Sequence, residues 1–481
     1  MELRRDSEVN RLFESGRAVQ AGALCVALAA ASSSGFVGQA AAQSLADTMV
    51  AAYLNSPELA AGRADVKVSS ERAVQARAGG LVRVEGQLSA EAFTRTNANQ
   101  SAARVPNYPT AMSLTVIQPI YTGGQVENQT EAAETRITAQ EAVLTATEQQ
   151  LLLDAVTAFL DVRRDEEFVA LGRNNVRVLT EQLRAARERF EVGEVTRTDV
   201  EQARSRLAGA QSRLAAEKGA LANSRETYSR VVGGYPGDLQ PPPPLPDLPE
   251  SQDEAVSMAL RDDPQVIVAR LQREATSSDV RAAIGALLPQ VSLQGRVTAG
   301  DTFNDGLKAP ETASVGVFVT VPIYNGGFNY SNVREAQAAA EGANADIDTA
   351  MRSAVRNVGA SWSSLDVSRA SIRAGRLEVR AAQLAFEGVQ EEAKVGARTT
   401  LDVLDAEQEL LNARGGLVAS RRDEQVAAYS VIASIGKLTV EHLGLDVGAA
   451  ADAASYYGSV RNRNFSYDAT DDTVWRTTWR P

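Results

Sequence analysis

The stretch VIQPIYTGGQ occupies residues 116–125, and a near copy, TVPIYNGGF, occupies residues 320–328. Each joins β-branched and aromatic residues, which favour strands, to a proline and a glycine pair, which interrupt regular structure. We therefore predict a joint between a strand and a helix at both places. The prolines should end strand pairing and the glycines should let the backbone change direction. The residues of the two joints are Pro119, Tyr121, Gly123, Gly124, Pro322, Tyr324, Gly326 and Gly327.

The repeated string is part of a duplication that covers most of the chain. Pro119 and Pro322 are 203 residues apart, and the same separation joins Gly193 to Gly396. Residues 43–232 and 251–447 are therefore predicted to be two structural repeats. The proline-rich stretch 233–250 should be a linker between them, because it can form neither a helix nor a central strand. Residues 448–481 show no periodicity and are predicted to be a flexible tail.

The composition of the 481 residues excludes several classes of protein. A formal charge of −12 argues against nucleic-acid binding, which normally needs a basic face. Residues 1–42 carry arginines, an apolar run and then small residues, the pattern of a secretory signal peptide; a cytoplasmic helix is the alternative. The only cysteine, Cys25, lies in that run. We therefore expect the mature chain to have no disulfide and to bind no metal or other cofactor.

Helix-forming residues follow each glycine pair, over residues 125–191 and 328–394. Such a helix would be about 100 Å long, so it needs partners along its whole length. Apolar residues in the second copy follow a heptad spacing typical of packed helices, with Val355 and Val358 at its start. A glycine, Gly193 or Gly396, can end each helix, and Thr198–Asp199 or Thr399–Asp402 can begin a returning one. The two long hairpins are predicted over residues 125–232 and 328–436.

Each repeat also contains a shorter helix, near residues 56–78 and 264–286, followed by two strand-like runs. The predicted strands are residues 81–95 and 111–121 in the first repeat, and 290–303 and 312–324 in the second. Their apolar and polar residues alternate over about ten positions, as in outer-membrane barrels; the edge of a soluble sandwich is the alternative. Four strands cannot close a barrel in lipid without leaving backbone groups unpaired, but three copies would supply twelve strands. Tyr121 and Tyr324 would then suit the membrane interface.

With these features in place, residues 44–445 resemble the TolC-type outer-membrane efflux and secretion channels. The resemblance lies in the starts NSPEL and DDPQV, the joints PIYTGG and PIYNGG, and the tips VGEVTRTDV and VGARTTLDVLDAE. It implies a mainly α fold with a small transmembrane β part: a homotrimer with a 12-strand outer-membrane barrel and a periplasmic α-barrel. The implied partners are outer-membrane lipid, a periplasmic membrane-fusion adaptor and an inner-membrane transporter, either ABC-type or proton-driven. The joints are closer to the type I secretion branch, yet drug efflux stays open.

The same resemblance implies where the functional residues lie. Asp402 and Asp405 match paired acidic residues that surround the periplasmic constriction, and Arg398 matches an arginine of the closing network. Capping of a helix is the alternative role for Asp402. The tips that meet the adaptor include Gly193, Asp199, Gly396 and Thr399. One departure is Ala393, which stands where the family's best-studied tip has a tyrosine, so a closing contact through that hydroxyl is absent or differently made here.

Two other classes of function, an enzyme and a periplasmic adaptor, are alternatives to a channel. An enzyme is not expected, since His442 is the only histidine and SIGKLT at residues 434–439 lacks the pattern of a phosphate-binding loop. A periplasmic adaptor or structural coiled-coil protein is the stronger alternative, because such proteins also carry signal peptides and helical hairpins. Adaptors usually have one hairpin beside small β domains, whereas this chain has two hairpins and amphipathic strand pairs.

Overall fold

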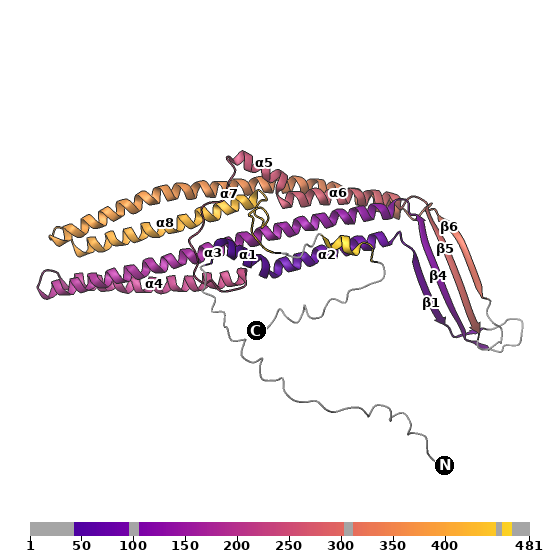
Figure 1. Ribbon diagram of the computed structural model, residues 1–481, viewed down its shortest axis with the longest axis horizontal. Helices are drawn as coiled ribbons and strands as arrows, with labels where there is room; N and C mark the ends of the chain where they lie inside the picture. The colour runs from indigo at the N-terminus through magenta and orange to yellow at the C-terminus, as the bar shows by residue number, and fades with distance from the viewer. Residues whose placement is uncertain (1–42, 96–104, 303–310, 449–454, 464–481) are drawn as a thin grey trace, which may run out of the picture. The chain divides into compact units, whose positions relative to one another are not determined.

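The computed structural model describes residues 43–95, 105–302, 311–448 and 455–463, and its elements form two similar halves (Figure 1). The first half contains α1 (Leu45–Asn55), α2 (Pro57–Ala78), β1 (Arg83–Ala90), β2 (Phe93–Arg95), β3 (Val105–Asn107), β4 (Pro109–Tyr121), α3 (Gln125–Glu191) and α4 (Arg197–Val232). The second contains α5 (Gln252–Asp262), α6 (Pro264–Gly285), β5 (Gln290–Thr302), β6 (Thr312–Thr320), α7 (Phe328–Lys394) and α8 (Thr400–Ser434), and α9 (Ser455–Val460) follows. The predicted signal peptide lies outside the described residues.

Each predicted short helix is preceded by a further helix, α1 or α5, that was not predicted. The break falls before Pro57 and Pro264, because proline lacks an N–H group and keeps the residue before it extended. Ser56 and Asp263 then cap the following helices. The Ser56 hydroxyl accepts a hydrogen bond from the Leu59 N–H at 3.2 Å, and Asp263 Oδ1 accepts one from the Gln265 N–H at 2.7 Å.

The two long helices, α3 and α7, contain 67 residues each. Each begins directly after a glycine in the left-handed region, with φ of 78° at Gly124 and 82° at Gly327. Each is followed by a tight turn and a returning helix, α4 or α8, as the duplicated sequence predicts. At 1.5 Å per residue, each long helix extends for about 100 Å.

Four strands form one antiparallel sheet in the order β1-β4-β5-β6, so the two halves of the chain meet between β4 and β5. The register places Leu88 beside Met112, Leu114 beside Val297, and Leu293 beside Val317. Directly opposed residues share a face. One face therefore carries these apolar side chains, all of them exposed: Val84, Leu88, Met112, Leu114, Leu293, Val297, Val315, Val317 and Val319.

The two joints differ from the prediction and from each other. Pro119 does not end strand pairing, because β4 continues to pair with β5 through Pro119 and, after a shift of register, Tyr121. Proline is tolerated there because the pairing of β4 with β1 has already ended at Ile117. The second joint leaves the sheet earlier than predicted. β6 ends at Thr320, so residues 321–324 are not part of the strand and Pro322 lies beyond the sheet.

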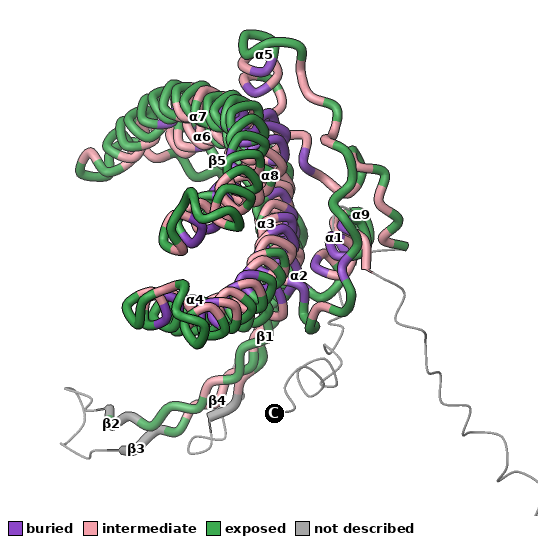
Figure 2. Tube along the Cα trace, turned by 90° about the vertical axis from the view of Figure 1, so that its left-hand side faces the viewer, coloured by how far each residue is buried: buried purple, intermediate pink, exposed green. Residues whose placement is uncertain are grey.

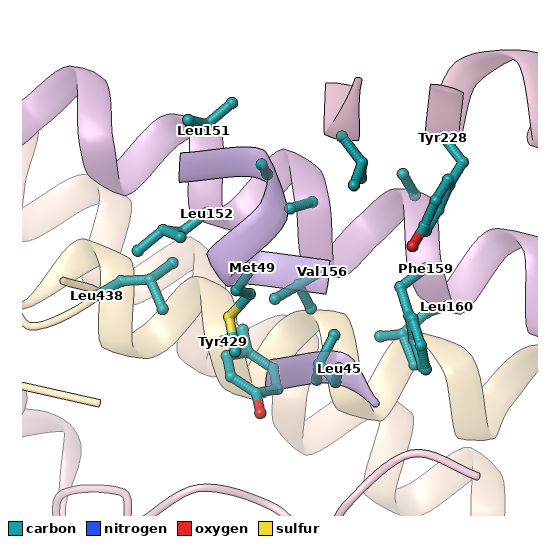
Figure 3. Packing of buried hydrophobic residues seen from close by; sticks show 14 of the residues in the cluster. Leu45, Met49, Leu151, Leu152, Val156, Phe159, Leu160, Tyr228, Tyr429 and Leu438 are labelled. Atoms are coloured by element: carbon teal, nitrogen blue, oxygen red, sulfur yellow. The ribbon is translucent and has the colours of Figure 1, made fainter. Parts of the chain in front are cut away.

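The helices of the hairpins lie side by side in the order α4, α3, α8, α7 (Figure 2). Nearer the sheet, α2 and α6 both pack on α3, and α6 also packs on α7. The main apolar core lies where α1, α3, α4 and α8 meet (Figure 3). Phe159, Leu152 and Tyr228 are nearly or fully buried there, and the Tyr228 hydroxyl is 3.0 Å from the Thr48 hydroxyl.

One residue of the predicted heptad pattern is not covered as expected. Val358 in α7 is fully buried, but Val355 is 41% exposed, whereas its counterpart in the first repeat, Leu152, has no exposed surface. The difference follows from position, since α3 lies between the hairpin helices α4 and α8, whereas α7 has a hairpin helix, α8, on one side only. The shorter helices α5 and α6 also pack on α7 but leave Val355 partly uncovered.

The linker and the described part of the predicted tail make specific contacts with the helices. In the linker, Leu239 is buried and pairs with Gln43, and the Pro243 carbonyl accepts a hydrogen bond from Gln425 in α8 at 3.1 Å. Part of the predicted flexible tail forms α9, which packs on α2. In the described ranges, we find no helix with the length and apolar character needed to cross a membrane.

Candidate functional site at the hairpin tips

The tips of the two hairpins have the same backbone geometry. Gly193 and Gly396 are left-handed, with φ of 79° and 76°, so a residue with a Cβ atom would be strained at either position. The Gly396 N–H donates to the Ala393 carbonyl at 3.2 Å, and the Gly193 N–H donates to the Phe190 carbonyl at 3.0 Å. The repeat therefore preserves the turn although the side chains differ.

A threonine and an aspartate cap each returning helix. In α8, Asp402 Oδ2 accepts hydrogen bonds from the Thr399 N–H at 3.0 Å and the Thr399 hydroxyl at 2.9 Å, and the Asp402 N–H donates back to that hydroxyl. In α4 the same arrangement joins Asp199 to Thr196. The cap of α4 is thus Thr196, and the prediction of Thr198 was wrong by two residues.

These contacts affect the charge of Asp402. The hydrogen bonds from the Thr399 backbone and side chain hold the pKa of Asp402 below its usual value, and nearby Arg398 acts in the same direction. The carboxylate is therefore ionised over the physiological range. Asp402 caps a helix, which is the alternative that the sequence left open, and its charge is available at the tip at the same time.

Asp405 lies almost one helical turn beyond Asp402 and has a different partner. Its Oδ1 accepts a hydrogen bond from Arg206 Nη2 at 2.5 Å, and both side chains are about half exposed, at 56% and 40%. Because Arg206 belongs to α4, this ion pair connects the two hairpins. A second contact between the same helices joins Arg213 to Gln408 at 2.6 Å.

Arg398 is not hydrogen-bonded to Asp402 or Asp405 among the described residues; its Nε donates to Glu392 Oε2 at 2.8 Å. Glu392 raises the pKa of Arg398 by hydrogen bonding and by its charge. Ala393 contributes to the turn only through its carbonyl oxygen. The contact between the two hairpins near the tips is made by Arg206, on the neighbouring hairpin.

Sequence reasoning missed Arg206 and Glu392. Arg206 lies 199 residues from Asp405, and no local spacing connects them. Glu392 could have been predicted as the partner of Arg398, because a side chain just beyond the end of a helix commonly contacts the last turn of that helix. Asp199 and Gly193 lie at the tip of the first hairpin, so the predicted tip residues fall at the two tips rather than in one cluster.

The residues of the strand–helix joints lie at the opposite ends of α3 and α7. Tyr121 is 47% exposed and Tyr324 is 84% exposed. A Cβ atom at Gly123, which is left-handed, would overlap the carbonyl oxygen of Gly285, so the first joint packs tightly against α6. At Gly326, also left-handed, the equivalent space is open.

Comparisons with known proteins agree with this architecture. The family model described as outer membrane efflux protein matches residues 49–234 and 255–437. The outer membrane efflux protein BepC of Brucella suis biovar 1 is 34% identical over 442 residues, covering 90% of this chain and 94% of BepC. The outer membrane protein TolC of Escherichia coli is 26% identical, covering 85% of each chain.

Solved structures share the fold at low sequence identity. The CmeC outer membrane channel of Campylobacter jejuni superposes with a TM-score of 0.73 at 17% identity, covering 87% of this chain and 89% of CmeC. CusC superposes with a TM-score of 0.72 at 18% identity, covering 82% and 92%. The alternative of an adaptor with one hairpin fails, because the family match covers both repeats. The chain belongs to the outer membrane efflux protein family, whose members are transport channels of the outer membrane rather than enzymes.

Proposed function

We propose that three copies of this chain form a channel that carries cargo across the periplasm and the outer membrane. The observation that carries this proposal is the four-stranded sheet, which has one apolar face and two outer strands, β1 and β6, that each have no partner on one side among the described residues. In lipid such edges must be paired, and three sheets of four strands would close into a 12-strand barrel. The apolar face would then contact outer-membrane lipid.

The helical hairpins continue the strands, so the same three copies would form a second tube about 100 Å long on the periplasmic side. Its far end would carry three copies of Asp402 and Asp405. Six carboxylates around a narrow opening repel one another and attract cations. We assign the gate to these residues and to Arg398, and the contact with a periplasmic adaptor to the tips at Gly193, Asp199, Gly396 and Thr399.

The Arg206–Asp405 pair gives the gate a closing contact within each chain. It joins α4 to α8, so separation of the hairpins requires that this pair be broken. An exposed ion pair contributes only about 0–1 kcal/mol, which a partner protein that binds the tips could supply. The transporter, ABC-type or proton-driven, would provide the energy for transport, since a passive channel has no source of its own.

Conductance of single channels in a planar bilayer tests the gate. Asp405→Ala and Arg206→Ala should each raise the conductance about twofold or more, because both remove the pair that closes the tip. Asp402→Ala should chiefly weaken block by multivalent cations. Arg204→Ala is a matched control, because the ion pair of Arg204 in the described part of the chain is with Glu201 of its own helix, at 2.9 Å. Unchanged conductance and block in all three variants would remove these residues from the gate.

The proposal has two versions, protein secretion and drug efflux, which differ in the cargo. AprF of Pseudomonas aeruginosa, named as an alkaline protease secretion protein, is 29% identical over 57% of this chain, and BepC is named as an efflux protein. Deletion of the gene followed by assays of secreted proteins and of drug sensitivity separates the two roles. Loss of secretion alone indicates type I secretion, drug sensitivity alone indicates efflux, and both defects indicate a shared channel.

A further inference from the structure

The face of the sheet opposite the apolar face carries an unusual set of charges. The four strands of this sheet contain four charged residues, Arg83, Glu85, Arg296 and Asp301. Asp301 lies at the loop end of the sheet, opposite Thr110. Arg83 is the first residue of β1, whereas Glu85 and Arg296 lie inside β1 and β5. Glu85 is paired with Thr115, and Thr115 with Arg296, so Glu85 and Arg296 share one row and one face.

Arg83 lies two residues before Glu85 and therefore on the same face. All three charged side chains thus avoid the face of Val84, Leu114, Val297 and Val315. An arginine that faces the middle of a bilayer destabilises a barrel. In a closed barrel with the apolar face towards lipid, these side chains line the interior.

The three charges do not cancel. Arg83 Nε lies 4.0 Å from Glu85 Oε1, which leaves Arg296 as the excess charge of the face. Arg296 is exposed, and two strand spacings, roughly 10 Å, separate its backbone from that of Glu85. Among the described residues, no hydrogen bond or ion pair of Arg296 is found. Each chain therefore contributes one net positive charge to this face, although the whole chain has a formal charge of −12.

We propose that Arg296 is a selectivity residue of the strand-lined part of the channel, where it attracts small anions and the anionic groups of cargo. The inference rests on the proposed trimeric channel and adds a second charged region of opposite sign to the acidic tip. Three arginines in a water-filled pore raise the local concentration of anions and lower that of cations. Cargo that has passed the acidic tip then meets a basic exit.

The experiment measures the permeability of the trimer to K⁺ relative to Cl⁻, from the reversal potential across a bilayer with a KCl gradient. Wild type and Asp405→Ala serve as two backgrounds, so that the exit is probed with the tip closed and with the tip opened. Arg296→Gln should raise the ratio of K⁺ to Cl⁻ permeability about twofold, and Arg296→Glu should raise it further. Arg296→Lys keeps the charge and should leave the ratio unchanged.

A second position tests the place of the charge rather than the particular side chain. Ser314 lies beside Arg296 in the register of β5 and β6. Ser314→Glu should therefore shift the ratio in the same direction as Arg296→Gln. Each variant is first checked for the trimer mass in detergent, which excludes loss of assembly as the cause.

The two possible failures are distinct. A wild-type protein that forms no trimer and no conducting channel contradicts the proposed function itself. A conducting trimer whose ion preference is the same in wild type, Arg296→Glu and Ser314→Glu, on both backgrounds, contradicts the inference and leaves the channel intact.

Discussion

A single buried carboxylate near the tip stands out at the scale of residues. Glu407 in α8 is only 8% exposed, and its Oε2 has no hydrogen-bond partner among the described residues. Burial raises the pKa of Glu407 to about 7, because a charge in an apolar environment loses its hydration. The position lies between Asp405, which faces Arg206, and the apolar Leu410.

This carboxylate makes stability depend on pH with a definite sign. The unfolded value is 4.5 and the folded value is about 7, so between these pH values the native state holds one proton more than the unfolded state. The free energy of unfolding should therefore fall as the pH rises from 4.5 to 7. Glu407→Gln should remove this slope and raise stability at pH 8 by about 1 kcal/mol.

Thermal unfolding of the detergent-solubilised protein, followed by circular dichroism at several pH values, measures the effect. Glu409→Gln is the matched control, since Glu409 lies two residues away on the exposed side of the same helix. A parallel loss of pH dependence in both variants would show that Glu407 is not the titrating group.

At the scale of elements, the short helix α9 is hydrogen-bonded to the helices near the sheet. The Tyr456 hydroxyl donates to Glu71 of α2 at 2.8 Å, and the Tyr457 hydroxyl donates to Glu134 of α3 at 2.7 Å. Arg77 donates to the Arg461 carbonyl at 3.3 Å. The helix has only 6 residues, so its order depends on these contacts rather than on its own propensity.

Removal of the two hydroxyls should release α9. In Tyr456→Phe with Tyr457→Phe, the amide hydrogens of residues 455–460 should exchange about fivefold faster or more, corresponding to about 1 kcal/mol for the lost bonds. Mass spectrometry of deuterated peptides measures the rate. Tyr330→Phe, at a tyrosine of α7 that is 60% exposed, is the control. Unchanged exchange in the double variant would mean that the remaining contacts, the hydrogen bond from Arg77 and the packing of Val460, hold the helix without the two hydroxyls.

Among the elements, the ends of the long helices could be predicted from the sequence, whereas contacts between distant segments could not. The ends of α3 and α7 were predictable, because glycine pairs and the duplicated VG turns mark them. Pro119 was misjudged, since the rule against proline in strands depends on which neighbouring strand needs the N–H group. The order of α9 and the Arg206–Asp405 pair depend on contacts between distant parts of the chain, which leave no local pattern.

At the scale of the whole molecule, the duplication predicts how copies of the chain meet. A shift of 203 residues carries α3 onto α7 and α8 onto α4. Within one chain α3 packs on α8, but among the described residues the equivalent helices α7 and α4 do not pack on each other. Leu152 and Leu438 are buried in the same core cluster, but their counterparts Val355 and Tyr235 are 41% and 66% exposed. The α3–α8 contact should therefore be repeated between chains, by α7 of one copy and α4 of the next.

The predicted contact between α7 and α4 identifies two positions for cross-linking. A Cβ atom at Gly415 of α8 would lie 3.3 Å from the Phe168 ring of α3, and the counterparts are Ser212 in α4 and Ser371 in α7. Both serines are exposed in the single chain, and α3 and α8 lie between their helices. In a Cys25→Ser background, Ser212→Cys with Ser371→Cys should give covalently linked dimers and trimers with a short bis-maleimide reagent on denaturing gels. Each single cysteine variant should stay monomeric, and a double variant that also stays monomeric would contradict the predicted contact between copies.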